Sequence, residues 1–338
     1  MKKYKLFPII LNLFDGNPNT NTTTDNTTGN NLSAEMKTYY STYLIRLAEP
    51  LLVHDQFGQK QPIPKNGGKT IEFRKWDPLP KMLTPLTEGV TPDGQNLNMG
   101  VITATVAQYG GYVTLSDMLM LTAIDNSLME ATRLIADQAA RTLDTITREV
   151  LNGGTNVQYG DGSKSARNAL VGGASSGNDY LTVDAVRKAV RFLKVQNAKP
   201  VSGNDFVGII HPDVAYDLMS DPAWVEWQKY TSPEHMYNNE IGKIAGVRFV
   251  ETTEAKVFTG GGASSRDVYS TLIIARDAYG VTEISGGGLQ HIVKQLGSAG
   301  TADPLNQRAT VGWKATKVAE RLVEQYMIRI ETASNFTA

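Results

Sequence analysis

The stretch KTIEFRKWDPLPKMLTPLTEGVTPDGQNLNMGVITATVAQYGGY, residues 69–112, is the part of the chain that decides its fold. It begins with Lys69–Trp76, where apolar and polar side chains alternate, and it ends with Gly100–Tyr112, which is rich in Val, Thr and Tyr. Both patterns are typical of β-strands. We expect the two strands to form the two sides of one hairpin.

The connection between these strands, Asp77–Met99, is long and irregular. It contains four prolines and two glycines, which prevent a regular helix or strand over most of its length. Connections longer than about 12–15 residues are uncommon in compact domains and usually serve a function, and an isolated two-stranded hairpin is only marginally stable in water. The pattern therefore predicts an extended loop that lies on a neighbouring molecule; the alternative is a surface loop without a partner.

A long helix is predicted downstream of this hairpin, over Ser127–Leu151. Its apolar residues recur at three- and four-residue steps, at Leu128, Ala131, Ile135, Ala139, Leu143, Ile146 and Val150. At ~1.5 Å per residue such a helix is about 37 Å long and would form the spine of a domain. We expect Asp137 to pair with Arg141, and Asp144 with Arg148, on its outer face.

The segment upstream of the hairpin has a different composition. Residues 1–31 are largely Asn, Thr and Gly after a short apolar run, and we expect a flexible arm. The run resembles a signal peptide, but Pro8 and Asn12 interrupt it, so we expect no secretion. Residues 32–52 show the apolar periodicity of a helix, which Pro50 ends.

A Gly- and Ser-rich stretch, 153–178, precedes a segment in which helix and strand patterns are mixed. Helices are predicted from the Thr182 cap to Val195 and after Pro212 and Pro222. Strands are predicted at Phe206–Ile210, Gly246–Thr252, Val268–Ala275, Leu289–Lys294 and Leu322–Glu331. The fold class is therefore α+β.

The composition argues against several kinds of function. The chain has no Cys, which removes disulfides and Cys-based zinc sites, and its 33 basic and 34 acidic residues give a net charge of −1, so we expect no dedicated DNA-binding role. The four histidines lack metal-ligand spacing. Gly68-Lys69-Thr70 ends like a phosphate-binding loop, but position 63 is Ile and a strand follows. We predict no catalytic, cofactor-binding or metal residues.

Several separated motifs occur in a recognisable order along the chain. They are Pro62–Lys75 (PIPKNGGKTIEFRK), Thr84–Val90 (TPLTEGV), Leu115–Asp117 (LSD), His211–Asp213 (HPD), Asp303–Arg308 (DPLNQR) and Val311–Lys314 (VGWK). Together with the order of the elements, these motifs resemble the major capsid proteins of tailed bacteriophages, in particular the N-four-like capsid family. The resemblance extends from about Leu32 onward.

The resemblance implies an α+β fold of the Hong Kong 97 type. It implies a flexible N-terminal arm at 1–31, a peripheral domain at 32–67, 113–179 and 301–338, an extended loop at 68–112 and an axial domain at 180–300. The implied function is a self-assembling shell of hexamers and pentamers around double-stranded DNA, without a cofactor or enzymatic activity. The implied partners are further copies, portal and scaffolding proteins, and packaged DNA in non-specific contact, with no membrane. The protein would assemble in the host bacterial cytoplasm and reside in the virion.

Within this picture the extended loop carries the expected contacts between subunits. The residues proposed for them are Lys69, Phe73, Arg74, Trp76, Pro85, Glu88, Tyr109 and Tyr112. Three alternative functions remain at this point. They are the shell of an encapsulin-like compartment, which shares the fold but holds cargo enzymes, a secreted surface or adhesion protein with an Asn/Thr-rich stalk, and an enzyme.

Overall fold

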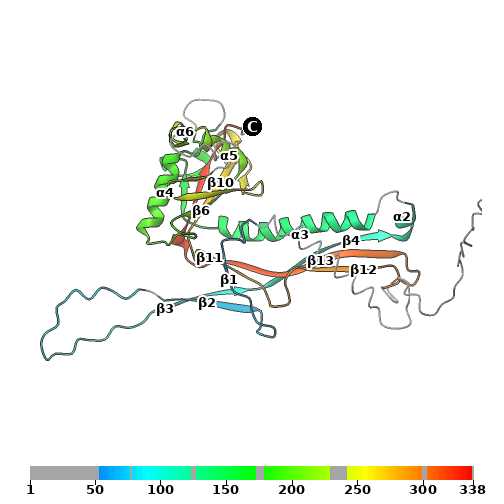
Figure 1. The fold of residues 1–338 in the computed structure, drawn as a ribbon, viewed down its shortest axis with the longest axis horizontal. Coiled ribbons are helices and arrows are strands. Elements are labelled where there is room, and N and C mark those ends of the chain that lie inside the picture. The colour runs from blue at the N-terminus through cyan, green and yellow to red at the C-terminus, as the bar shows by residue number, and fades with distance from the viewer. Residues whose placement is uncertain are drawn as a thin grey trace, which may run out of the picture.

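The computed structural model describes residues 53–76, 78–122, 127–172, 179–228, 242–298 and 303–336. The predicted arm at 1–31 and the predicted helix at 32–52 lie outside these residues, which begin at Val53. Within them, the chain forms an elongated lower layer, a more compact upper body and a long projecting loop (Figure 1). The predicted mixture of helices and sheets is confirmed.

The lower layer is a five-stranded sheet covered by the long helix. Its strands are β1 (Gln59–Lys60), β11 (Tyr279–Thr282), β13 (Arg308–Arg321), β12 (Gln290–Lys294) and β4 (Ala107–Ser116). Strand β13 is central, because β4 pairs with it antiparallel from Ala107↔Lys317 to Ser116↔Arg308. Strand β12 pairs with residues 310–314 of the same stretch, and β11 pairs with residues 318–321. The 14-residue β13 was not predicted as a strand.

Helix α3 (Ser127–Asn152) matches the predicted spine helix and runs along β4 and β13 (Figure 1). Its predicted apolar stripe is the buried face, since Ile135, Ala139 and Leu143 pack with Val311 and Trp313 of β13. This shared core fixes the direction of the whole lower layer. The short helix α2 (Asp117–Thr122) precedes α3.

One predicted ion pair on α3 is right and the other is wrong. Arg141 lies 3.4 Å from Asp137 on the exposed face. Asp144, however, is fully buried and binds His54, while Arg148 contacts Glu149 and Glu254. Position 144 lies next to Leu143 of the buried stripe, so its carboxylate faces another segment of the chain instead of solvent.

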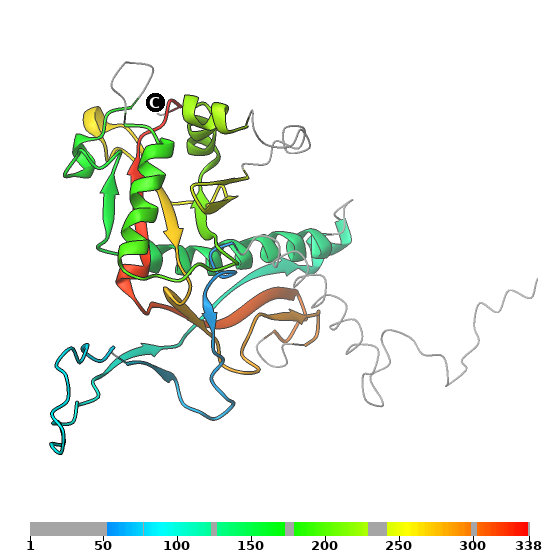
Figure 2. The same ribbon diagram turned by 60° about the vertical axis from the view of Figure 1, so that its left-hand side comes forward.

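The upper body is built on a seven-stranded sheet with the order β5-β14-β10-β6-β8-β7 and with β9 paired to β10. Its strands are β5 (Val157–Tyr159), β14 (Met327–Thr332), β10 (Val268–Ile274), β6 (Phe206–Ile210), β8 (Val247–Glu251), β7 (Lys243–Ile244) and β9 (Val257–Phe258). Helices α4 (Val183–Val195), α5 (Pro212–Met219) and α6 (Pro222–Gln228) accompany it (Figure 2). Within the described residues, short 3-10 helices lie at Arg167–Ala169, Ala263–Ser265 and Glu324–Tyr326.

Local signals explain where these helices begin. Thr182 accepts a hydrogen bond from the Ala185 N–H at the start of α4, as predicted. Pro212 and Pro222 open α5 and α6, as predicted, and the His211 side chain accepts from the Asp213 N–H. Apolar residues of α4 pack with Phe206, Ile210 and Ile273 of the sheet.

The C-terminal strand starts later than predicted. The strand begins at Met327, and all six of its residues are buried because β14 lies between β10 and β5. The polar residues therefore do not face solvent. Glu331 binds Arg167 through two contacts of 2.6 and 2.7 Å, and Arg329 lies 2.8 Å from the same carboxylate.

The sheets exchange strands across the predicted domain boundaries. Strand β14, from the predicted peripheral segment 301–338, lies in the upper sheet. Strands β11 and β12 lie in the lower sheet, although both fall in the predicted axial segment 180–300. A third core, which includes Leu151, Ile274, Tyr279 and Met327, joins the two layers. The axial and peripheral assignments stay predictions.

A buried polar cluster fixes the chain just before the loop. His54 donates its backbone N–H to Asp144 at 2.9 Å, and its Nδ1 lies 2.6 Å from the same carboxylate. Asp55 accepts from Thr147 at 2.5 Å and binds Lys317, which also donates to the Leu143 carbonyl at 2.8 Å. Burial lowers the pKa of Lys317, and Asp55 opposes that shift.

Replacing Asp144 by Ala should therefore lower the free energy of unfolding by about 3 kcal/mol, because it leaves two buried groups of His54 without their acceptor. Asp137→Ala, on the exposed face of the same helix, should lower it by less than about 1 kcal/mol. Urea unfolding of the unassembled variants measures both values. Equal losses would mean that the buried cluster contributes no more than the surface pair.

Candidate functional site: the extended loop and the end of helix α2

The loop projects from a small two-stranded sheet. Strand β2 (Thr70–Trp76) pairs antiparallel with β3 (Met99–Thr105), from Thr70↔Thr105 to Trp76↔Met99. The predicted hairpin is confirmed over these residues. It is wrong beyond Thr105, because Ala107–Ser116 pairs with β13. Strand β13 forms ten residue pairs with this segment, so the chain turns at Val106 into the lower sheet.

The base of the loop is held by the rest of the chain. The Val106 N–H donates to the Lys69 carbonyl at 2.8 Å, and Ile63 forms a bridge with Ile284. The Phe73 side chain is buried over Gly280, where an added Cβ would lie 2.9 Å from the Phe73 ring. A glycine at position 280 therefore makes the space that lets the hairpin rest on β11.

Beyond this base the chain leaves its own surface. Residues 78–98 form no helix or strand, and every one of them is exposed except Gln95, which is half-buried. A backbone hydrogen bond from the Val90 N–H to Thr87 at 3.1 Å makes one turn within the loop. Figure 1 shows the loop extending well past the last paired residues of β2 and β3.

The composition of the loop surface is unusual for a segment in water. Leu83 is 83% exposed and Leu86 is 75% exposed. The set of exposed large apolar residues in the loop, here called the loop patch, is Leu79, Met82, Leu83, Leu86, Val90 and Leu97. Contiguous exposed apolar residues of this kind mark interaction sites.

A second exposed apolar patch lies at the other end of the lower layer. It is formed by Met118, Leu119 and Leu121 of α2 together with Leu305, and it is here called the α2 patch. Leu305 is close to α2 in the fold, because the Asp117 N–H donates to the Gln307 carbonyl at 3.0 Å. Figure 1 shows α2 and the loop at opposite ends of the layer formed by α3, β4 and β13.

The predicted contact residues divide into two groups in this structure. Trp76, Arg74, Lys69, Pro85, Glu88 and Tyr112 are exposed, with Tyr112 at 74%. Arg74 has a neighbour in its own strand, Glu72, at 3.9 Å. Phe73 is buried in its own chain, and Tyr109 is half-buried against the core beneath α3. The α2 patch was not predicted, although the run Met118–Leu121 offered four consecutive apolar residues as a signal.

The described residues give no sign of a chemical site. They contain no group of three or more His, Asp or Glu side chains arranged to hold a metal ion. Nor does any helix among them combine the length and the apolar character that crossing a membrane requires. Trp224 is buried, and the side chain of Trp227 lies outside the described part.

Comparison with known proteins gives a consistent result. A family model described as phage capsid protein matches residues 100–319. Among curated proteins, none matches this chain. Solved structures with the same fold include the capsid of the cyanophage P-SCSP1u, with 13% identity, a TM-score of 0.64, and coverage of 84% of this chain and 88% of that one.

Two further structures agree. The capsid asymmetric unit of the cyanophage Pam1 has 16% identity and a TM-score of 0.64 over 86% of this chain and 92% of that one. The capsid of Ralstonia phage GP4 has 15% identity and a TM-score of 0.62 over 83% of this chain and 88% of that one.

Hydrogen exchange measures the loop geometry directly. In the unassembled chain, amides of residues 78–98 should exchange within seconds because almost none is hydrogen-bonded, whereas amides of β4 paired with β13 should exchange at least about 100-fold more slowly. Comparable protection of the two segments would contradict the projecting loop.

Proposed function

The chain belongs to the phage capsid protein family and is a structural major capsid protein that forms the shell, and we propose that its copies join through the loop patch into hexamers and pentamers. The observation that supports this proposal is the exposure of six large apolar side chains on a segment with little structure of its own. Burying each Leu would contribute about 1.5–3 kcal/mol. Such a loop is stabilised when a second copy covers it.

The position of the two apolar patches suggests how copies meet. The loop patch and the α2 patch lie at opposite ends of one elongated layer (Figure 1). Contacts between two different surfaces of identical subunits form rings when the rotation between subunits closes. We propose that the loop of one copy lies along the neighbouring copy toward its α2 patch, so that each subunit both gives and receives one contact.

The proposed contact surface keeps most of the residues expected from the sequence. Trp76, Pro85 and Glu88 would contact the neighbour together with Lys69, Arg74 and Tyr112, all of which are exposed. Phe73 and Tyr109 would support the loop from within their own subunit, since they are packed there. In this proposal the segment 68–105 is the extended loop, and 107–112 belongs to the lower sheet.

The remaining assignments follow from membership in the family. We propose that the upper body lies around the axes of the hexamers and pentamers and that the lower layer forms the peripheral region. We further propose an icosahedral shell that encloses double-stranded DNA, assembly in the host cytoplasm with portal and scaffolding proteins, and no enzymatic activity. The encapsulin-like and secreted alternatives are set aside, because the matching family is one of phage capsid proteins.

A double substitution in the loop patch tests the proposed contact. Leu83→Ser with Leu86→Ser should reduce the yield of closed shells at least tenfold in electron micrographs, because two apolar side chains are lost from every copy of the interface. The melting temperature of the unassembled chain should stay within about 2 °C, since neither side chain packs on its own subunit.

The matched control is Leu134→Ser with Leu296→Ser, two exposed apolar residues outside both patches and outside the upper body. These variants should assemble like the unmodified chain. Normal shells from the loop variant, or equal losses from both variants, would refute the proposed contact.

A further inference from the structure

The outer face of helix α4 carries an excess of positive charge. The helix contains four cations, Arg187, Lys188, Arg191 and Lys194, and one carboxylate, Asp184. All four cations are exposed. Because the whole chain has a net charge of −1, this helix is a local concentration of charge that the overall composition does not reveal.

Three of these cations are unpaired within the described part of the chain. Lys188 lies 2.9 Å from Asp184, which neutralises both groups. Arg187, Arg191 and Lys194 form no ion pair with any described residue. They line a shallow hollow whose other lining residues, Val190, Val195 and Ala245, are apolar.

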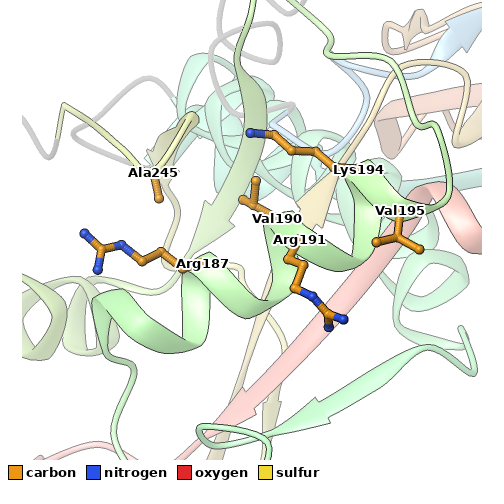
Figure 3. Close-up of a pocket in the computed structure, with 6 residues that line it drawn as sticks. All are labelled: Arg187, Val190, Arg191, Lys194, Val195 and Ala245. Atoms are coloured by element: carbon orange, nitrogen blue, oxygen red, sulfur yellow. The ribbon is translucent and has the colours of Figure 1, made fainter.

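Figure 3 shows how the three side chains leave the helix. Arg187 and Lys194 extend toward the side where Ala245 lies, with Val190 between them, and Arg191 points to the other side. Arg191 also lines a second hollow together with Lys164 and Lys188. The cations thus form a row along the helix with groups directed to both sides of it.

The spacing of this row suits a phosphate backbone. Positions 187, 191 and 194 are one turn apart, so at ~1.5 Å per residue the row spans about 10 Å along the helix axis. Phosphates along one strand of a duplex follow at ~3.4 Å per step along its axis. A row of this length therefore covers about three phosphates of one strand. One guanidinium group can bind two oxygens of a phosphate through two parallel hydrogen bonds.

We propose that the face of α4 formed by Arg187, Arg191 and Lys194, here called the α4 basic surface, binds the phosphate backbone of nucleic acid without reading its sequence. The proposal rests on the proposed function, in which the shell encloses DNA, and it names the surface that meets this polymer. No base-reading group is required, since contacts to phosphates carry no sequence information.

The acidic surface of a second copy is the competing partner. It would have to present a row of unpaired carboxylates at the same spacing. On the long helix α3, however, the exposed carboxylates are already engaged: Glu130 lies 2.6 Å from Arg133, Asp137 lies 3.4 Å from Arg141, and Glu149 lies 2.8 Å from Lys256. Helix α3 of a second copy therefore offers no such row, whereas nucleic acid carries one charge at every step of each strand.

The test compares two triple variants of the unassembled full-length chain. Arg187→Gln/Arg191→Gln/Lys194→Gln removes the α4 basic surface. Arg133→Gln/Arg141→Gln/Lys243→Gln removes the same charge from residues that are paired with Glu130, Asp137 and Asp205. Binding to a fluorescent 25-base-pair duplex of random sequence is followed by anisotropy between about 50 and 200 mM salt.

The proposal predicts at least a tenfold loss of affinity for the α4 variant at low salt. It also predicts that the slope of log affinity against log salt becomes shallower by about 2.7, or about 0.9 for each lost phosphate contact. The control should change affinity by less than about threefold. Unchanged binding by the α4 variant, or equal losses in both variants, would overturn the proposal.

Electron microscopy of the same variants separates this proposal from the proposed function. Shells from the α4 variant, together with weaker binding to the duplex, support the α4 basic surface as the contact with nucleic acid. Loss of shells with unchanged binding to the duplex would show instead that the surface contacts a second copy. Failure of the unmodified chain to form shells would count against the proposed function, while the binding measurement on unassembled chain would still stand.

Discussion

The apolar side chains of residues 78–98 are not buried by the described part of their own chain, and the arrangement of the molecule follows from this constraint. The loop is fixed at its base, where Phe73 packs over Gly280 and Val106 closes the hairpin, and it is free beyond Trp76. In the assembly that we propose, the same apolar groups become contacts when copies meet, and their burial then favours assembly.

A loop that reaches a neighbour has to leave its own subunit in a defined direction. That direction is set by the layer of α3 and β13, whose shared core includes Ile135 and Trp313. The buried contacts of His54 with Asp144 and of Asp55 with Lys317 tie the preceding segment to this layer. In the proposed contact, a fixed base with a projecting, weakly structured tip would combine precise placement with adaptation to the neighbour's surface.

Much of this fold could be predicted from periodicity and caps. The stripe on α3, the Thr182 cap and the all-apolar strand at Phe206–Ile210 are strong local signals, and each matches the structure. Strand β13 was missed because its inward positions hold mainly small residues, such as Ala309 and Ala315, and also Lys317, which weakens the alternation. The polar residues of β14 are buried for a reason outside the strand, namely Arg167, which lies 164 positions away from Glu331 in the sequence.

The candidate site, too, could be predicted from the sequence only in part. The extended loop was evident from its prolines, but its true end at Thr105 depends on a competing partner strand far away in the sequence, β13. The position of the loop and of α2 at opposite ends of the lower layer is a property of the folded shape (Figure 1). The most direct test of the account is a photo-reactive amino acid at position 83, irradiated in assembled shells. We predict covalent dimers whose cross-linked peptides join position 83 to the neighbouring copy near Met118–Leu121, and cross-links found solely within one chain would contradict the account.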